Sequence, residues 1–113
     1  MQITCKRLIL SSIILGSMVG MLPAAAIEVI HLNIKGHQFQ PAEISIPANT
    51  KVKLRIHNQD ATPEEFESHS MHREKLIPAG AKRVIYIGPL DAGSYEFYGE
   101  FHPKTAKGRI IVK

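Results

Sequence analysis

The stretch that decides the fold runs from Gly93 to Gly108 and reads Gly-Ser-Tyr-Glu-Phe-Tyr-Gly-Glu-Phe-His-Pro-Lys-Thr-Ala-Lys-Gly. Its first half is aromatic and alternates with polar residues, the period of two of a half-buried strand. The pattern predicts a strand from Tyr95 to Phe101. Turn-forming residues after it, including Pro103, separate this strand from a last one, Arg109 to Val112.

Further strands are predicted toward the N-terminus by the same alternation. They begin at Ile27 and continue in the segments Ile44 to Ile46, Lys51 to His57 and Arg83 to Ile87. Asp60 to Lys75 interrupts the pattern, and there we expect a short strand, Glu64 to Glu67, followed by a loop or one helical turn. About seven short strands separated by turns are typical of an all-β, Greek-key β-sandwich.

The N-terminus has the pattern of a secretory signal. Lys6 and Arg7 precede an apolar run, Leu8 to Met21, and Ala24-Ala25-Ala26 fits the small-residue rule for signal-peptidase cleavage. We expect a signal peptide over residues 1–26 and one domain over residues 27–113, which implies export to the periplasm. The alternative is a retained N-terminal anchor, although the run is shorter than the roughly 20 residues of a membrane span.

Cleavage would change the composition. The full chain has 113 residues and a formal net charge of +4; residues 27–113 keep 12 of the 14 Lys and Arg and all 10 Asp and Glu, a net charge of +2. The cations form no block, so nucleic acid is not expected as a partner. The single cysteine, Cys5, leaves with the signal, which excludes disulfides, zinc fingers, iron–sulfur clusters and cysteine nucleophiles.

The Gly93–Gly108 stretch resembles the C-terminal copper loop of the cupredoxins, G-x-Y-x-F-Y-C-x-x-H followed by a short loop with a Met, a Gly and the last strand. The residues in register are Gly93, Tyr95, Phe97, Tyr98, His102 and Gly108. The segment Asn58 to Pro63 is similar to the turn before the first copper histidine of that family. The resemblance covers nearly all of residues 27–113 and implies a cupredoxin-type sandwich.

Carried over position by position, the resemblance implies an altered ligand set. Glu64 replaces the first histidine, Gly99 replaces the cysteine, and His102 is retained. The axial methionine position falls at Thr105 or Ala106. Blue copper needs two His, a Cys thiolate and a weak axial ligand, so no type 1 copper site is expected.

The remaining donors are carboxylates and imidazole, which suit Cu(II), iron, manganese or zinc better than Cu(I). The candidate ligands are Glu64, Glu100 and His102, with Glu67 assisting. Glu64 lies on the opposite face of a regular strand from Glu65 and Glu67, so the three acids cannot all meet one ion there. The alternatives are a solvated acidic edge and a structural histidine in a turn.

A second, softer site is conceivable at His69-Ser-Met71-His72, where Met71 and His72 are candidate copper ligands on a loop. An ordinary loop can contain the same residues. His31, His37 and His57 are expected on strands or turns as non-ligands.

Two segments, Pro-Glu-Glu-Phe-Glu from Pro63 and Gly-Glu-Phe-His from Gly99, are similar to those of cupredoxin-like domains associated with bacterial iron-permease systems. That resemblance implies copper or iron handling beside an iron permease or another periplasmic protein. The competing interpretations are a metal-free module that docks on a transporter and, less favoured, a copper electron carrier. No nucleophile–base pair at recognisable spacing is present, so we do not expect an enzyme.

Overall fold

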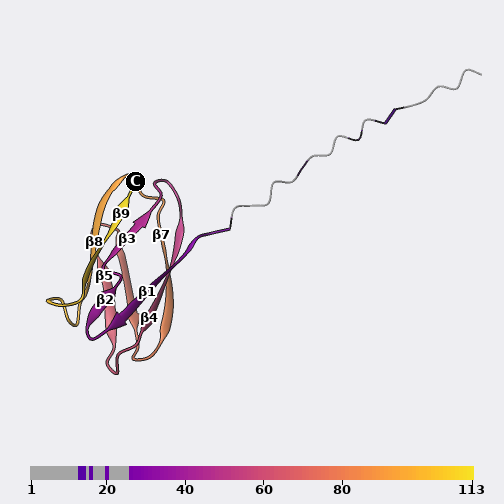
Figure 1. Ribbon diagram of the computed structural model, residues 1–113. Coiled ribbons are helices and arrows are strands. Elements are labelled where there is room, and N and C mark those ends of the chain that lie inside the picture. The colour runs from indigo at the N-terminus through magenta and orange to yellow at the C-terminus, as the bar shows by residue number, and fades with distance from the viewer. Residues whose placement is uncertain (1–12, 15, 17–19, 21–25) are drawn as a thin grey trace, which may run out of the picture.

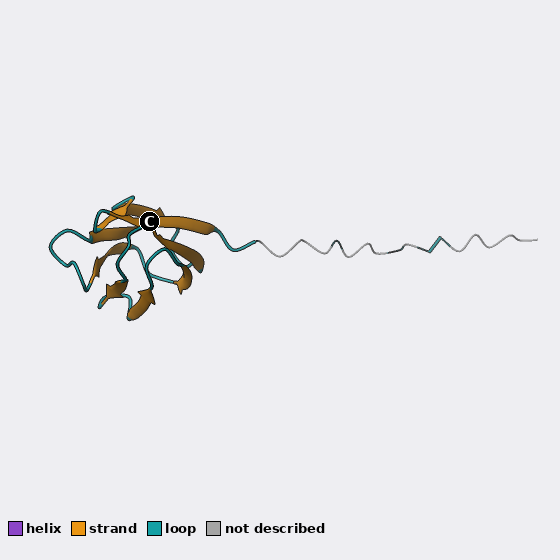
Figure 2. Ribbon diagram, turned by 90° about the horizontal axis from the view of Figure 1, so that it is seen from below, coloured by secondary structure: helices purple, strands orange, loops and turns teal. Residues whose placement is uncertain are grey.

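A computed structural model describes Ile13, Ile14, Gly16, Gly20 and residues 26–113 of the chain (Figure 1). The predicted signal peptide therefore lies almost entirely outside the described residues. Within the described part the secondary structure is all β, and no helix there is long and apolar enough to cross a membrane (Figure 2). The nine strands of the described residues are β1 Val29–Lys35, β2 Gln38–Gln40, β3 Glu43–Ile46, β4 Val52–Asn58, β5 Glu64–Ser68, β6 Arg73–Ile77, β7 Lys82–Ile87, β8 Gly93–Gly99 and β9 Lys107–Val112.

The strands form two layers, which confirms the predicted β-sandwich. One sheet has the order β2-β1-β4-β7 and the other the order β3-β9-β8-β5-β6. The pairs β1–β4 and β3–β9 are parallel, and the remaining pairs are antiparallel. Each layer thus mixes segments that are far apart in the sequence.

Two strands were not predicted from the sequence. β2 has only three residues between two turns, and β6 is the charged sequence Arg-Glu-Lys-Leu-Ile, in which one residue, Ile77, is fully buried. β6 pairs antiparallel with β5 through a tight turn, His69 to His72, so a hairpin stands where we expected a loop or helical turn.

The core lies between the sheets and follows from the alternation of side chains. In β4, Val52, Leu54 and Ile56 are buried while the intervening residues point outward. Three aromatic rings join the layers: Phe39 meets Phe66 and Phe97 edge-on, and the latter two stack with centroids 5.0 Å apart. This core fixes the ends of β4, β5 and β8, from which the candidate site is built.

Candidate metal-binding site

Glu64 and His102 meet at one end of the sandwich, as the ligand carry-over predicts. The His102 Nδ1 lies 2.6 Å from Glu64 Oε2, and the backbone N–H of Phe101 donates to Glu64 Oε1 at 2.9 Å. Glu64 is 1% exposed. Burying a carboxylate is costly unless it is paired and hydrogen-bonded, and here the chain itself satisfies both oxygens.

The turn that delivers Glu64 is held by a buried asparagine at the end of β4. The Asn58 side-chain amide donates to the carbonyl of Thr62 at 2.8 Å and to that of Ile77 at 3.1 Å, and its oxygen accepts from Asp60 N at 3.0 Å. The predicted turn from Asn58 to Pro63 is thereby closed by local hydrogen bonds. Glu64 starts β5 immediately after it.

A second carboxylate–imidazole pair packs on the first. The rings of His37 and His102 stack with centroids 3.6 Å apart, and His37 Nδ1 lies 3.5 Å from Asp60 Oδ2. The backbone N–H groups of His37 and Gly36 also donate to the Asp60 carboxylate. These hydrogen bonds, above all the one from His37, lower the pKa of Asp60. No local pattern in the sequence predicts this contact, because the packing of the two sheets is what brings His37 to His102.

The place of a copper thiolate is filled. A Cβ added at Gly99 would lie 2.5 Å from Glu64 Cδ and 2.7 Å from the Cβ of Ala106, far inside contact distance. Ala106 is fully buried and its carbonyl accepts from Gly99 N, so Ala106, rather than Thr105, lines this position. Residues 64, 99, 102 and 106 therefore do not fit a type 1 copper ion.

Three other carboxylates converge on the outer face of the five-stranded sheet. Glu65 and Glu67 of β5 and Glu100, just after β8, can each offer an oxygen within 4.8 Å of the others. The N–H of Glu100 donates to the carbonyl of Glu65 at 2.9 Å, which sets this spacing. We call these three residues the carboxylate cluster. As expected from strand alternation, Glu64 points into the sandwich and takes no part in it.

The cluster is crowded with negative charge. A hydrogen bond shared with the Glu74 carboxyl, with desolvation and neighbouring acids, raises the pKa of Glu65 to about 7. Desolvation and the charges of Glu74 and Glu100 raise the pKa of Glu67. Glu67 Oε2 is buried and has no hydrogen-bond partner among the described residues. A cation bound between the carboxylates would relieve the repulsion and satisfy this oxygen.

The predicted ligands therefore fall into separate groups. Glu64 and His102 form one pair, whereas Glu67 and Glu100 belong to the carboxylate cluster with Glu65. Glu65 was recognised as a neighbour of Glu67 but not as a candidate ligand. Glu74 was missed because finding it requires the β5–β6 hairpin, which places it directly opposite Glu67.

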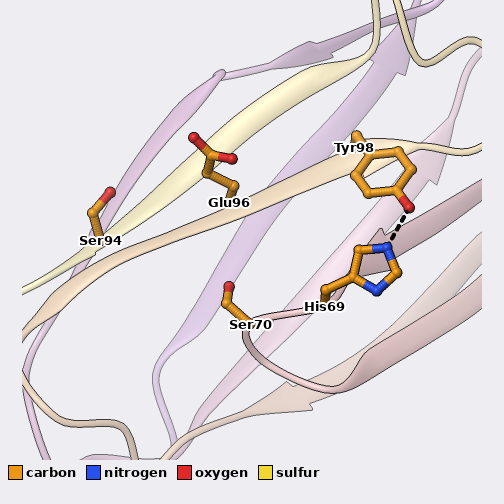
Figure 3. A pocket seen from close by; sticks show the side chains of 5 residues that line it. All are labelled: His69, Ser70, Ser94, Glu96 and Tyr98. Carbon is orange, nitrogen blue, oxygen red and sulfur yellow. Dashed lines mark hydrogen bonds between the residues drawn. The ribbon is translucent and has the colours of Figure 1, made fainter.

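Met71 and His72 do not lie together in an open loop. Met71 is 5% exposed and belongs to the hydrophobic core, while His72 is exposed at the β5–β6 turn with a φ of 53°. The turn presents His69 instead, whose Nε2 lies 2.8 Å from the Tyr98 hydroxyl (Figure 3). This pair lines a shallow hollow together with Ser70, Ser94 and Glu96.

Comparison with known proteins gives a family and a set of related folds. The family model of the cupredoxin-like domain matches residues 8–112 of this chain. An uncharacterized protein of Rickettsia prowazekii (strain Madrid E) is 47% identical over 83 residues, which cover 74% of this chain and 66% of that protein. The matched part is thus just under two thirds of that relative's length.

Several copper proteins share the fold. The metal-binding domain of the Cu(I)-exporting P-type ATPase CopA of Streptococcus pneumoniae D39 superposes with a TM-score of 0.67 at 20% identity, covering 75% of this chain and 84% of that one. Auracyanin A, a blue copper protein of Chloroflexus aurantiacus, gives 0.68 at 15% identity, covering 78% and 100%. Amicyanin of Paracoccus versutus gives 0.58 at 20% identity, covering 82% and 86%. At these identities the likeness shows the fold alone.

Proposed function

Since the chain belongs to the cupredoxin-like domain family, we propose that it is an exported metal-handling protein whose ion is held by carboxylates instead of a copper thiolate. The observation that carries the proposal is the carboxylate cluster, in which three side chains each bring an oxygen within 4.8 Å of the others and one of them, Glu67, has a buried oxygen without a partner among the described residues. Its role is binding and delivery, not catalysis.

The donor chemistry selects the class of ion. Carboxylate oxygens are hard ligands and favour Cu(II), Fe(II) or Fe(III) over Cu(I), which prefers thiolate and thioether sulfur. The only methionine of residues 26–113, Met71, is in the core. The donor chemistry argues against Cu(I), and the resemblance to the cupredoxins and to iron-permease-associated domains is what favours copper or iron among the remaining ions. We therefore propose a periplasmic role in copper or iron handling or uptake, with a permease or another periplasmic protein as the recipient.

The Glu64–His102 pair supports the cluster. Glu64 accepts from the backbone N–H of Glu65, which belongs to the cluster, and from that of Phe101, which follows the cluster residue Glu100. Its role in this proposal is to hold the β5 and β8 ends at the spacing that the cluster needs. The hydrogen bond between His102 Nδ1 and Glu64 Oε2, 2.6 Å long, joins the two side chains directly, so the pair needs no bound ion to hold it together.

Titration of the metal-free protein with Cu(II), Fe(II), Fe(III), Mn(II) and Zn(II) tests the proposal. Tyr98 lies opposite Glu67 in the register of β5 and β8, so a change in tyrosine fluorescence provides a signal. Glu67→Gln and Glu100→Gln should each weaken Cu(II) or iron binding by about ten-fold or more, because each removes a charged oxygen ligand. Glu96→Gln removes the same charge from an exposed position on β8 and should leave binding within about two-fold.

The other outcomes assign different functions. Loss of binding in a Glu64→Ala/His102→Ala variant, with unchanged binding in Glu67→Gln, would place the ion at the end of the sandwich and contradict the cluster assignment. Absence of micromolar binding in the wild type would favour the second candidate, a metal-free module that docks on a transporter or another exported protein. That candidate is supported by the filled thiolate position at Gly99.

A further inference from the structure

Among the residues that the structure describes, the outer face of the four-stranded sheet carries cations and no acid. Its outward side chains follow from the strand register, and we call them, together with Lys51, the basic face. They are Val29, His31, Asn33, Lys35, Gln38, Gln40, Lys53, Arg55, His57, Lys82, Val84 and Tyr86. Lys51 precedes β4 and places its ammonium 4.8 Å from the centre of the Tyr86 ring, on the same face.

These cations are not neutralised within the protein. The five of them, Lys35, Lys51, Lys53, Arg55 and Lys82, make no ion pair within 4.0 Å in the described part of the chain. Arg55 lies across from His31 on β1, and His57 lies across from Lys82 on β7, so that two titratable imidazoles sit among them. The sequence scatters these cations from residue 35 to residue 82, and only the sheet gathers them.

The opposite face of the sandwich has the reverse charge. The outward side chains of the five-stranded sheet include Glu43, Glu65, Glu67, Glu74 and Glu96 against the cations Lys107 and Arg109. Arg109 is already paired with Glu43 at 2.8 Å. The molecule is thus electrically polar across its thickness, and one layer attracts anions while the other repels them.

We propose that the basic face docks flat on an anionic lipid surface, the headgroup layer of a membrane that contains acidic phospholipid. The cations are spread over three neighbouring strands, which lie about 4.8 Å apart, and so match a planar array of anionic groups better than a single narrow chain. Lying flat brings all of them within the Debye length of about 8 Å at physiological ionic strength. Each cation near such a surface strengthens binding about five-fold.

A second copy of the chain is a poorer occupant of the same face. Its complementary surface would be the acidic face, and that contact is head-to-tail, so it does not close into a dimer. On a membrane, by contrast, the acidic face is repelled and turns outward. The docked molecule therefore presents Glu67 and Glu100 away from the lipid, open to an arriving ion or partner.

Vesicle sedimentation tests the proposal on the full chain, with residues 1–25 identical in every variant. The wild type should bind vesicles of 30% phosphatidylglycerol in phosphatidylcholine, bind pure phosphatidylcholine at least ten-fold more weakly, and be released by 0.5 M NaCl. Lys53→Glu/Arg55→Glu should weaken binding to the anionic vesicles by at least 25-fold. Lys104→Glu/Lys107→Glu changes the net charge equally outside the basic face and should stay within about three-fold.

A milder variant, Lys51→Gln/Lys82→Gln, covers the case in which the Lys53→Glu/Arg55→Glu variant misfolds. Its affinity for the anionic vesicles should also fall by about 25-fold. Equal binding to neutral and anionic vesicles, or equal losses in the two charge-reversed variants, would overturn the proposal. So would salt-sensitive self-association of the wild type, measured by light scattering without lipid, that Lys53→Glu/Arg55→Glu removes. Metal titration of the same variants keeps this result separate from the proposed metal site, which lies on the other sheet.

Discussion

Glu64 is the residue on which the end of the sandwich depends. Replacing it with Gln keeps the side-chain volume but removes the negative charge from the hydrogen bond to His102. It also replaces one of the two hydrogen-bonded oxygens by an amide nitrogen. We expect Glu64→Gln to lower the free energy of unfolding by about 2 kcal/mol in urea titrations at neutral pH. Glu43→Gln, which removes an exposed partner of Arg109, should cost about 0.5 kcal/mol or less; equal losses in both would contradict the role assigned to Glu64.

Gly99 is required because its neighbours leave no space for a side chain. The added methyl of Gly99→Ala would collide with the Glu64 carboxyl and with Ala106, so we expect a loss of about 1–3 kcal/mol from overpacking. Glu64→Asp withdraws the carboxyl by one methylene and should make the double variant less destabilised than the sum of the two single variants. Urea unfolding of the four proteins measures this coupling, and simple additivity would show that Gly99 and Glu64 do not compete for space.

At the scale of single residues, the resemblance predicted the central contact at the position of the family's copper site but not the residues that pack around it. Glu64 and His102 were expected to meet, and they do. The stacking of His37 on His102 depends on how the first sheet packs over the second, and no local pattern in the sequence reports that. Met71 could not be distinguished from a loop ligand until the hairpin around it placed it in the core.

The hairpin of β5 and β6 carries a pH dependence of stability. The folded protein holds a proton at Glu65 up to a pKa of about 7, whereas an unfolded chain releases it near ~4.3. The folded state therefore binds more protons between these values, and stability should fall as the pH rises from about 4.3 to 7. The raised pKa of Glu67 acts in the same direction.

Thermal unfolding at a series of pH values measures this effect. Glu65→Gln should flatten the decline, and Glu96→Gln, on the same sheet but outside the cluster, should leave it unchanged. A wild-type stability that rises through this interval would contradict the raised pKa of Glu65. Saturating Cu(II) or iron at pH 7.5 should raise the melting temperature of the wild type more than that of Glu67→Gln, since bound ions stabilise the state that binds them.

Among the elements, strands with a clear period of two were predicted well, and charged or very short ones were not. β4 and β8 have alternating apolar residues because one face of each is buried. β6 lies at a sheet edge, and because most of its side chains are charged and exposed, its sequence shows no apolar alternation from which a strand could be predicted. Glu74, which lies opposite Glu67 in the hairpin, was missed together with that strand.

For the molecule as a whole, three phenylalanine rings hold the two layers together. Phe66 is fully buried between Phe39 and Phe97, so Phe66→Ala leaves a cavity and should cost about 3–5 kcal/mol. Phe101 is 46% exposed, and Phe101→Ala should cost much less, about 0.5–1 kcal/mol. Urea denaturation compares the two, and similar losses would mean that the aromatic contacts do not dominate the core.

The charge separation between the layers illustrates what a composition cannot show. A formal net charge of +4 indicates a mildly basic chain, yet every acid of the described strands lies in the five-stranded sheet, while the outer face of the four-stranded sheet bears cations and no acid. The fold class followed from alternation and turns. The distribution of charge followed from which strands became neighbours, and that is set by long-range packing.

The buried carboxylate of Glu64 has a consequence for the life cycle of the protein. Proteins whose folding is coupled to metal binding remain unfolded until they are loaded, and removal of the metal denatures them. Here the Glu64 carboxylate completes the end of the sandwich through hydrogen bonds within the chain, so folding needs no metal ion at this position. An ion that binds at the carboxylate cluster, as we propose, would therefore enter and leave without unfolding the protein.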